Sequence, residues 1–227
     1  MSNFGFAHLR VVNPFELAFR EARSAVGAAS LLAQAGEFRS LEHAVADCSL
    51  VVGATALSRR DPRHPVRDLQ QGARLIRKHL CAGRVALVFG SEKRGLSNED
   101  FSHCHWLLQI RTREEHRSMN LGQAVAVCLY ELVREVRSTS AGEKSALATA
   151  GDLERITSLL LEALEASDYL KSHFRSSGQR SAAPAEEKIR RFIRRLNLSE
   201  ADAELLLGML RQILWKLEAV KDGEGKG

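Results

Sequence analysis

The sequence has little of what marks a secreted, disulfide-stabilised or membrane-spanning protein. Its 227 residues include only 4 cysteines, 4 prolines and 6% aromatic residues. The cysteines are scattered inside apolar stretches, without the spacing of a disulfide scaffold. No apolar run approaches the roughly 18 residues of a membrane helix, and residues 1–10 lack the pattern of a signal peptide. We therefore expect a soluble protein of the cytoplasm without membrane contact.

The charge balance is mildly basic, with 33 Lys and Arg against 28 Asp and Glu and a formal net charge of +5. Hydrophobic residues make up 44% and charged residues 27%, which is typical of a globular protein rather than a disordered one. Basic residues gather at Arg59–Arg67, Arg111–Arg117 and Lys188–Arg195. Each group alone is more typical of a solvated face, and together they indicate a polyanionic partner only weakly. The scarcity of aromatic residues argues against a platform for stacking single-stranded bases.

The first two thirds of the chain alternate short β-branched runs with longer amphipathic stretches. This alternation is typical of a parallel sheet covered by helices on both faces, so we predict an α/β domain over residues 1–137. An apolar stripe from Val66 to Leu80 predicts a helix that starts at Pro65. The other expected helices are Ser40–Val45 and Leu121–Leu132, and the expected strands are Leu9–Val12, Leu50–Gly53, Arg84–Phe89 and Trp106–Ile110.

Beyond residue 137 the strand signals end. Residues 138–150 are mostly small and polar, without period, which is typical of a linker. Apolar residues at helical spacing then predict three helices in a small helical domain over residues 151–222. Ser199 is the expected N-cap of the third helix. The three apolar stripes run through Leu153–Leu164, through Ile189–Leu196, and through Leu206, Met209, Ile213 and Leu217.

The loop within VFGSEKRGLSNED, residues 88–100, carries the strongest local signal. A glycine at Gly90 lets the chain turn sharply at the carboxyl edge of the sheet, where α/β proteins bind their ligands. The spacing to Gly95 and Ser97 is close to that of a phosphate-binding P-loop, but Leu96 stands where such a loop needs lysine. The alternative is a glycine-rich turn followed by a helix capped at Ser97, which leaves Glu92 without an explanation.

A second segment, IRTREEHRSMNLGQAV at residues 110–125, leads from a strand through a polar loop into a long helix. Free main-chain amides at the start of such a helix favour an anionic or polar ligand group. The alternative is an ordinary helix cap made by Ser118 or Asn120. The nearby run His103-Cys104-His105 lacks a second pair of ligands, so we expect no metal site.

The two segments together are similar to a known family. FG-x-E-x-x-GLSNE at residues 89–99, followed by SMNL-x-QAV at residues 118–125, resembles motifs 2 and 3 of the SPOUT-class RNA 2′-O-ribose methyltransferases of the TrmH superfamily. The run LVVGATA at residues 50–56 resembles the strand and cofactor loop that precede these motifs. A linker followed by a helical domain that opens with GDLER resembles the TrmJ branch, which methylates the anticodon loop of tRNA.

This resemblance implies a trefoil-knotted fold, a homodimer with the active site at the subunit interface, and S-adenosylmethionine as methyl donor. It assigns catalysis to Glu92, Ser118 and Asn120, which we expect to act by positioning and hydrogen bonding rather than covalently. The implied cofactor-binding residues are Ala54, Thr55, Ala56, Gly90, Ile110, Arg117, Ser118 and Met119. The expected contacts with RNA, here tRNA, are Arg59, Arg111, Arg113, Lys188, Arg191 and Arg195, with Arg190 and Arg194 of the same helix.

Two features depart from the family. Its motif 1, a strand and helix with a catalytic arginine, would precede Met1, so we expect a sheet without its first strand and a Met1 internal to a longer protein. Leu57 stands where the family commonly has arginine. The chain as given is therefore expected to be less stable and impaired in catalysis. A non-catalytic RNA- or cofactor-binding relative is the alternative function, and a nucleotide-binding α/β protein is a more distant one.

Overall fold

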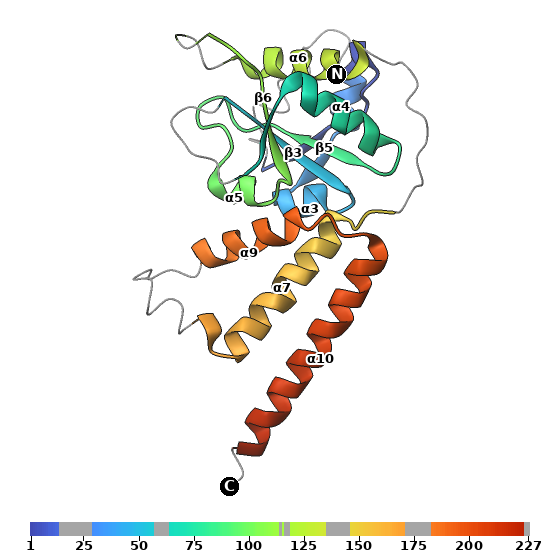
Figure 1. Ribbon diagram of the computed structural model, residues 1–227. Coiled ribbons are helices and arrows are strands. Elements are labelled where there is room, and N and C mark those ends of the chain that lie inside the picture. Colours follow the sequence, from blue (N-terminus) through green and yellow to red (C-terminus); the bar gives the residue numbers. More distant parts are fainter. Residues whose placement is uncertain are drawn as a thin grey trace.

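The computed structural model describes residues 1–13, 29–56, 64–113, 115, 119–134, 146–170 and 183–224. It has two parts: an α/β unit that ends with Arg134, and a helical unit that begins at residue 146 and lies below it in Figure 1. The predicted α/β class and the predicted C-terminal helical part are both confirmed. Within the described ranges, none of the helices has the length and apolar character needed to cross a lipid bilayer.

The central sheet has four parallel strands in the order β4 (Val66–Asp68), β6 (Trp106–Gln109), β3 (Leu50–Thr55) and β5 (Val85–Val88). A separate parallel pair joins β1 (Arg10–Val12) to β2 (Gly36–Phe38). Among the described strands, β1 pairs only with β2, and β5 pairs only with β3. The predicted strands at β1, β3, β5 and β6 are therefore confirmed, whereas β2 and β4 were not predicted.

Helices cover both faces of the central sheet (Figure 1). One face packs against α4 (Leu69–Leu80) and α6 (Leu121–Arg134), and the other against α3 (Leu41–Val45) and α5 (Asn98–Ser102). Successive residues of a strand point to opposite faces. In β3, Leu50 and Val52 therefore join the core under α4 and α6, while Val51 joins the core under α3 and α5. The short elements η1 (Ser2–Phe4) and α2 (Ala29–Ala33) complete this unit.

The helix predicted from Pro65 is wrong at its start. Val66 instead pairs with Leu107 in β4, and α4 begins at Leu69. Asp68 ends the strand and caps the helix, because its carboxylate accepts a hydrogen bond from the amide of Gln71 at 2.9 Å. The predicted helix is therefore about one turn too long at its N-terminus.

The helical unit consists of α7 (Ala150–Ala166), α9 (Ala183–Arg195) and α10 (Glu200–Glu224). Capping boxes start two of these helices. Thr149 exchanges hydrogen bonds with Asp152 at the start of α7, and Ser199 does the same with Asp202 at the start of α10, as predicted for Ser199. The end of the expected linker is folded onto this unit, since the amide of Ala148 donates to the carbonyl of Leu198 at 3.0 Å.

The stripe predicted for the third helix is wrong in part. The residues of α10 that pack against α7 are Ala203, Leu207 and Leu210, and they are buried. Met209 and Ile213 are instead 53% and 48% exposed. The apolar face of α10 is wider than the surface that α7 covers, so the sequence contains two overlapping stripes and its periodicity does not tell which one is buried.

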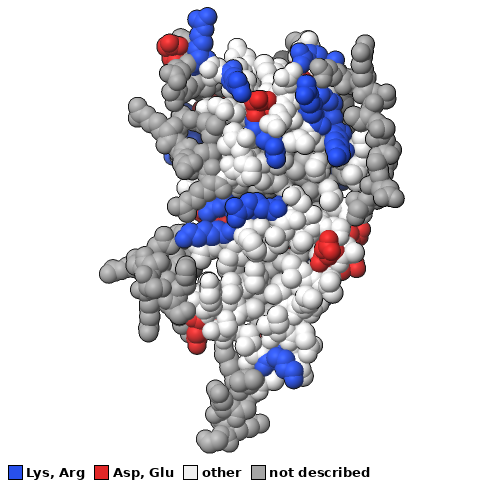
Figure 2. Space-filling view, in the orientation of Figure 1, with Lys and Arg blue, Asp and Glu red and all other residues white. Residues whose placement is uncertain are grey.

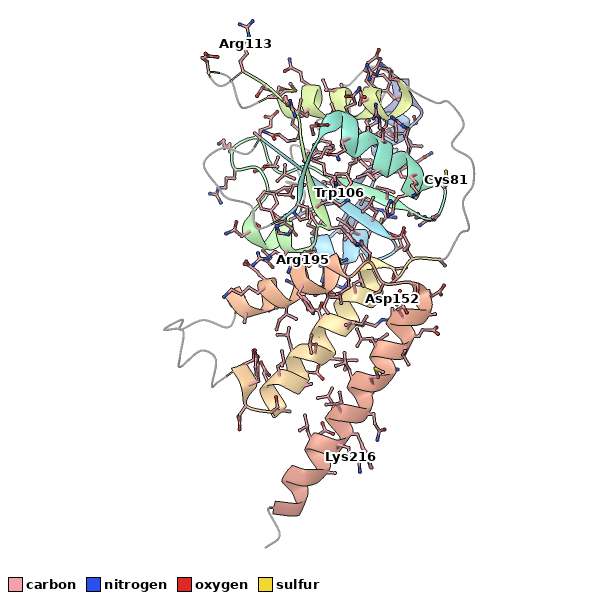
Figure 3. The ribbon with its side chains drawn as sticks, viewed as in Figure 1. Cys81, Trp106, Arg113, Asp152, Arg195 and Lys216 are labelled. Atoms are coloured by element: carbon pink, nitrogen blue, oxygen red, sulfur yellow. The ribbon has the colours of Figure 1, made fainter. Side chains whose placement is uncertain are left out.

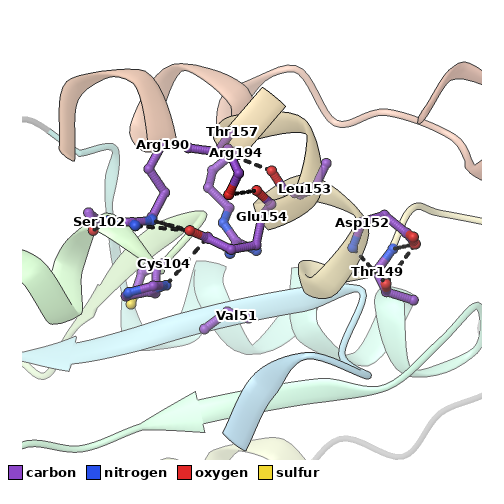
Figure 4. Close-up of polar contacts among 12 residues, drawn as sticks. Val51, Ser102, Cys104, Thr149, Asp152, Leu153, Glu154, Thr157, Arg190 and Arg194 are labelled. Atoms are coloured by element: carbon purple, nitrogen blue, oxygen red, sulfur yellow. Dashed lines mark hydrogen bonds and ion pairs between the residues drawn. The ribbon is translucent and has the colours of Figure 1, made fainter. Parts of the chain in front are cut away.

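A buried ionic cluster joins the two units (Figure 4). Glu154 of α7 accepts hydrogen bonds from Arg190 at 2.9 Å and from Arg194 at 3.3 Å, both on α9. Arg190 also donates to Ser102 of α5 at 3.1 Å, and so ties α9 to the α/β unit. The side chains of Arg190 and Arg194 are only 8% and 1% exposed. One carboxylate thus holds two arginines in the interior of the contact between α7, α9 and α5.

Candidate functional site

Three strands of the central sheet end side by side. The ladder between β3 and β6 runs as far as Thr55 opposite Gln109, and the ladder between β3 and β5 ends at Gly53 opposite Val88. The main-chain groups of Ala56, Gly90 and Ile110 therefore lie just past the last paired residues, at the carboxyl edge of a parallel sheet. This edge is where open α/β sheets bind ligands. The structure brings together these segments, which carry five of the eight residues predicted to bind the cofactor: Ala54, Thr55, Ala56, Gly90 and Ile110.

The loop after β5 folds back tightly on itself. The amide of Gly95 donates to the carbonyl of Ser91 at 2.8 Å, and Gly95 has a φ of 66°, which favours glycine. A Cβ atom built on Gly90 would overlap the main chain of Gly95 and Leu96, so only glycine fits at position 90. Leu96 is buried in the core under α3 and α5. This anchoring holds the tip of the loop, which carries Glu92, above the sheet edge.

Glu92 and Asn120 meet at this edge. The side-chain amide of Asn120 donates to Oε1 of Glu92 at 3.3 Å, although the two residues are 28 positions apart. The other atom of the amide, Oδ1, accepts from the main-chain amides of Gly122 at 2.9 Å and Gln123 at 3.4 Å, and so caps α6. The helix-cap interpretation and the site interpretation of Asn120 are therefore compatible, because one side chain makes both contacts. Met119 directly precedes this cap and is partly buried.

Other predicted site residues lie elsewhere or cannot be placed. Arg59, Arg117 and Ser118, together with Leu57, fall outside the described residues. Arg111 lies at the end of β6, is 81% exposed and pairs with Asp68 at 3.3 Å. Arg113 is exposed and projects from the loop after β6, away from the sheet (Figure 3).

The basic residues of α9 divide into two sets. Lys188 and Arg195 are exposed, and Arg191 pairs with Glu187 at 3.5 Å on the same helix. Figure 2 shows basic side chains gathered over α9 at its boundary with the α/β unit. The expectation that Arg190 and Arg194 contact RNA phosphates is wrong. Both are buried on Glu154, because a helix with basic residues in consecutive pairs presents some of them to the protein interior.

The sequence did not indicate that the α/β unit adds His64 beside α9. His64, just before β4, is partly buried, and its pKa is lowered to about 4, first by burial and then by the charges of Arg191 and Arg195. Arg67 of β4 lies with its guanidinium 5.6 Å from the ring centre of Trp106. This contact places Arg67 on the face of the sheet that packs against α4 and α6, and not beside α9.

The carboxyl edge of a parallel sheet, a glycine loop closed on itself and a capped helix start together make up the candidate ligand site of this α/β protein. The sequence profile of the SpoU rRNA Methylase family matches residues 1–130. The chain belongs to this family, and by family it is an RNA methyltransferase.

Individual relatives agree with this assignment. The chain is 31% identical to a tRNA (cytidine/uridine-2'-O-)-methyltransferase TrmJ of Sodalis glossinidius, over 94% of this chain and 83% of the relative. The TrmJ of Escherichia coli O6:K15:H31 is also 31% identical, over 94% of this chain and 86% of its own length. The crystal structure of TrmJ from Z. mobilis superposes with a TM-score of 0.77 and 27% identity, covering 94% of this chain and 89% of that one. The predicted similarity to the TrmJ branch is confirmed.

Proposed function

We propose that this protein transfers a methyl group from S-adenosylmethionine to a ribose 2′-hydroxyl of tRNA, at a nucleotide of the anticodon loop. The observation that carries the proposal is the hydrogen bond between Glu92 and Asn120. It joins the two motifs, from separate parts of the chain, at the edge of the sheet. The TrmJ relatives, named as tRNA 2′-O-methyltransferases, support the choice of substrate.

The residues present fit such a methyl donor. Main-chain groups of Ala56, Gly90 and Ile110 lie past the paired part of the sheet, and the absence of a side chain at Gly90 brings the loop main chain close. These groups, with Met119, would hold the donor. S-adenosylmethionine supplies a methyl group made reactive by its positive sulfur. The chain needs only to hold that methyl in line with the 2′-oxygen and to help remove the hydroxyl proton.

Asn120 and Glu92 are the described side chains best placed for this work. Asn120 is fixed by the cap of α6, and it fixes Glu92 in turn through one hydrogen bond. Glu92 is exposed at the tip of its loop, where it would contact a bound ribose. We assign both to positioning and hydrogen bonding at the reacting oxygen, together with Ser118.

Basic side chains would hold the RNA backbone. Arg111 and Arg113 follow β6 and are exposed, as are Lys188 and Arg195 of α9, whereas Arg191 of the same helix is only 13% exposed and pairs with Glu187. Figure 2 shows basic side chains gathered over α9 as a whole. Contacts to phosphate position an RNA without reading its bases. The α/β unit would thus act as the methyltransferase domain of residues 1–137, and residues 151–222 as an RNA-binding domain after the linker 138–150.

The family resemblance also supports three further parts of this proposal. They are a knotted chain around the donor site, a homodimer with the active site at the interface of the α/β units, and a cytoplasmic location. Arg59 and Arg117 would contribute to the RNA and donor sites respectively.

A methyl-transfer assay tests the proposed reaction. Labelled S-adenosylmethionine and unmodified tRNA should give label in the ribose, and Glu92→Gln or Asn120→Ala should slow transfer about 10²-fold. Glu99→Gln is the matched control, because Glu99 is an exposed acid on the neighbouring helix α5. Binding of tRNA and donor without methyl transfer, both in this chain and in a version extended upstream, would instead favour the non-catalytic relative.

The salt dependence of RNA binding tests the role of α9. Lys188→Ala and Arg195→Ala should each reduce the slope of log K against log salt by about one. Arg155→Ala is the control, since Arg155 is an exposed arginine of α7 that pairs with Asp152. An unchanged slope in both α9 variants would remove this helix from the RNA-binding surface.

A further inference from the structure

The outer face of α10 carries an apolar stripe that α7 does not cover. Leu205, Met209 and Ile213 follow one another at four-residue steps and are 62%, 53% and 48% exposed. They are separated from the face that packs on α7, which consists of Ala203, Leu207 and Leu210. The helix also extends well beyond the rest of the helical unit, with Lys216 on its outer half (Figure 3). A row of apolar side chains along an extended helix is typical of a helix that pairs with another helix.

The residues of this stripe are arranged symmetrically about Met209. Leu205 precedes Met209 by four residues and Ile213 follows it by four. One step further, Asp202 precedes Met209 by seven residues and Lys216 follows it by seven. These positions recur at steps of three and four residues, so all five lie on one face of the helix. The stripe is therefore acidic at one end, basic at the other and apolar between.

This pattern is complementary to its own reverse. If a second α10 lies antiparallel against the first with Met209 at the two-fold axis, Leu205 lies opposite Ile213 of the partner helix. Asp202 of each helix then lies opposite Lys216 of the other, so that the contact has a charge pair at both ends. In an isologous interface each contact occurs twice, so one charge pair and one apolar pair in the sequence give two of each in the dimer. A parallel arrangement would instead place like charges side by side.

We propose that the stripe of α10 is a self-association surface that binds the same stripe of a second copy of this chain in antiparallel orientation. The contact spans about 21 Å between Asp202 and Lys216, at 1.5 Å per residue. A contact of this size is small, so the association is reversible and depends on protein concentration. It is separate from the homodimer proposed for the α/β units, since α10 lies at the opposite end of the molecule from α6 (Figure 1).

Disulfide trapping tests the geometry directly. In a Cys81→Ser background, which removes the exposed native cysteine, Met209→Cys places two thiols against each other at the two-fold axis. Mild oxidation should give a covalently linked dimer of the intact chain. Glu218→Cys is the matched control, because position 218 is exposed on the opposite side of the same helix. Equal or slower linking of Met209→Cys than of Glu218→Cys would overturn the proposal.

Sedimentation over a range of protein concentrations tests the energetics. Met209→Glu places two carboxylates across the axis and should weaken the association at least about tenfold, so that tetramers become dimers or dimers become monomers. Arg211→Glu is the control, since Arg211 is exposed on the same helix but lies outside the stripe. Circular dichroism should show both variants folded. The same association constant for Met209→Glu and the wild type would contradict the proposal.

Discussion

Replacing Glu154 with glutamine should destabilise the whole protein, because two buried arginines share this carboxylate. The glutamine keeps the shape of the side chain but removes its charge. Arg190 then retains Glu186 at 2.5 Å and Ser102 at 3.1 Å. Arg194 is left without a carboxylate among the described contacts, and its Nε and Nη1 atoms already have no hydrogen-bond partner there. An uncompensated charge in such a place costs about 3–5 kcal/mol.

The expected loss is a large part of a typical free energy of unfolding of about 5–15 kcal/mol. With a urea dependence of about 2–3 kcal/mol per molar, the midpoint should fall by about 1–2 M. Unfolding can be followed in a Trp215→Phe background through the fluorescence of Trp106, which is buried in the α/β unit. The mutated carboxylate lies in the helical unit, so a shift of this signal also measures how strongly the two units are coupled.

Two further variants separate this explanation from a general loss of packing. Glu186→Gln removes the half-exposed partner of Arg190 and should cost less than about 1 kcal/mol. Arg194→Leu combined with Glu154→Gln should cost less than the sum of the two single changes, because the uncompensated charge is gone. A loss below about 1 kcal/mol for Glu154→Gln, or strict additivity in the double variant, would refute the reasoning.

Three other predictions concern His103, the glycines of the loop and Asn120. Burial and the adjacent charge of Arg190 lower the pKa of His103 to about 4, so between pH 6.5 and 4 only the unfolded chain takes up this proton. His103 should therefore contribute up to about 3 kcal/mol to the fall in the free energy of unfolding as the pH is lowered through this range. Urea midpoints of the wild type and of His103→Gln measure this contribution as a difference. Gly90→Ala should lower the free energy of unfolding by about 3 kcal/mol, because the new methyl group meets main-chain atoms. Gly95→Ala places its methyl group in open space and should cost only the backbone strain of a positive φ, about 1–2 kcal/mol. Thermal unfolding of both variants measures the difference. Asn120→Ala should lower the free energy of unfolding by about 1 kcal/mol, because the cap of α6 is lost. Asn120→Asp keeps the cap but abolishes the hydrogen bond to Glu92. For Asn120→Asp, calorimetry should therefore show normal stability and the methyl-transfer assay a slow enzyme.

Each of these predictions has an outcome that contradicts it. A His103→Gln variant whose pH dependence matches the wild type would remove His103 as a cause of acid sensitivity. Equal destabilisation by the two alanine substitutions would show that the loop main chain yields to the added methyl group. An Asn120→Asp variant as fast as the wild type would show that the hydrogen bond to Glu92 does not position it for the reaction.

The parts of the fold that the sequence predicts are those with a strong local pattern. The apolar run of β3 and the long stripe of α6 could hardly form other elements. β4 and β2 are three residues each, and they exist only through partners far away in the chain, such as Leu107 opposite Val66. No local pattern carries that information. The face of α10 that is buried was also undecided, because both of its stripes satisfy the same periodicity.

The candidate site shows the same division. Gly90, Glu92 and Asn120 were identified as residue types suited to a ligand site, each within its own loop. The contact between Glu92 and Asn120 depends on how the chain brings β5 and β6 to one edge, which spacing alone does not give. Burial of Arg190 and Arg194 depends on a carboxylate of another helix, so their positive charge alone led to the wrong expectation.

The amide group of Asn120 has a consequence for how this edge can change shape. Its oxygen and its nitrogen are bound to different segments, so the planar group acts as a spacer of fixed length between the start of α6 and the tip of the loop after β5. A shift of either segment by more than a fraction of an ångström breaks one of its bonds. Opening of the edge to admit a large molecule must therefore move both segments together, break the single hydrogen bond to Glu92, or release the helix cap.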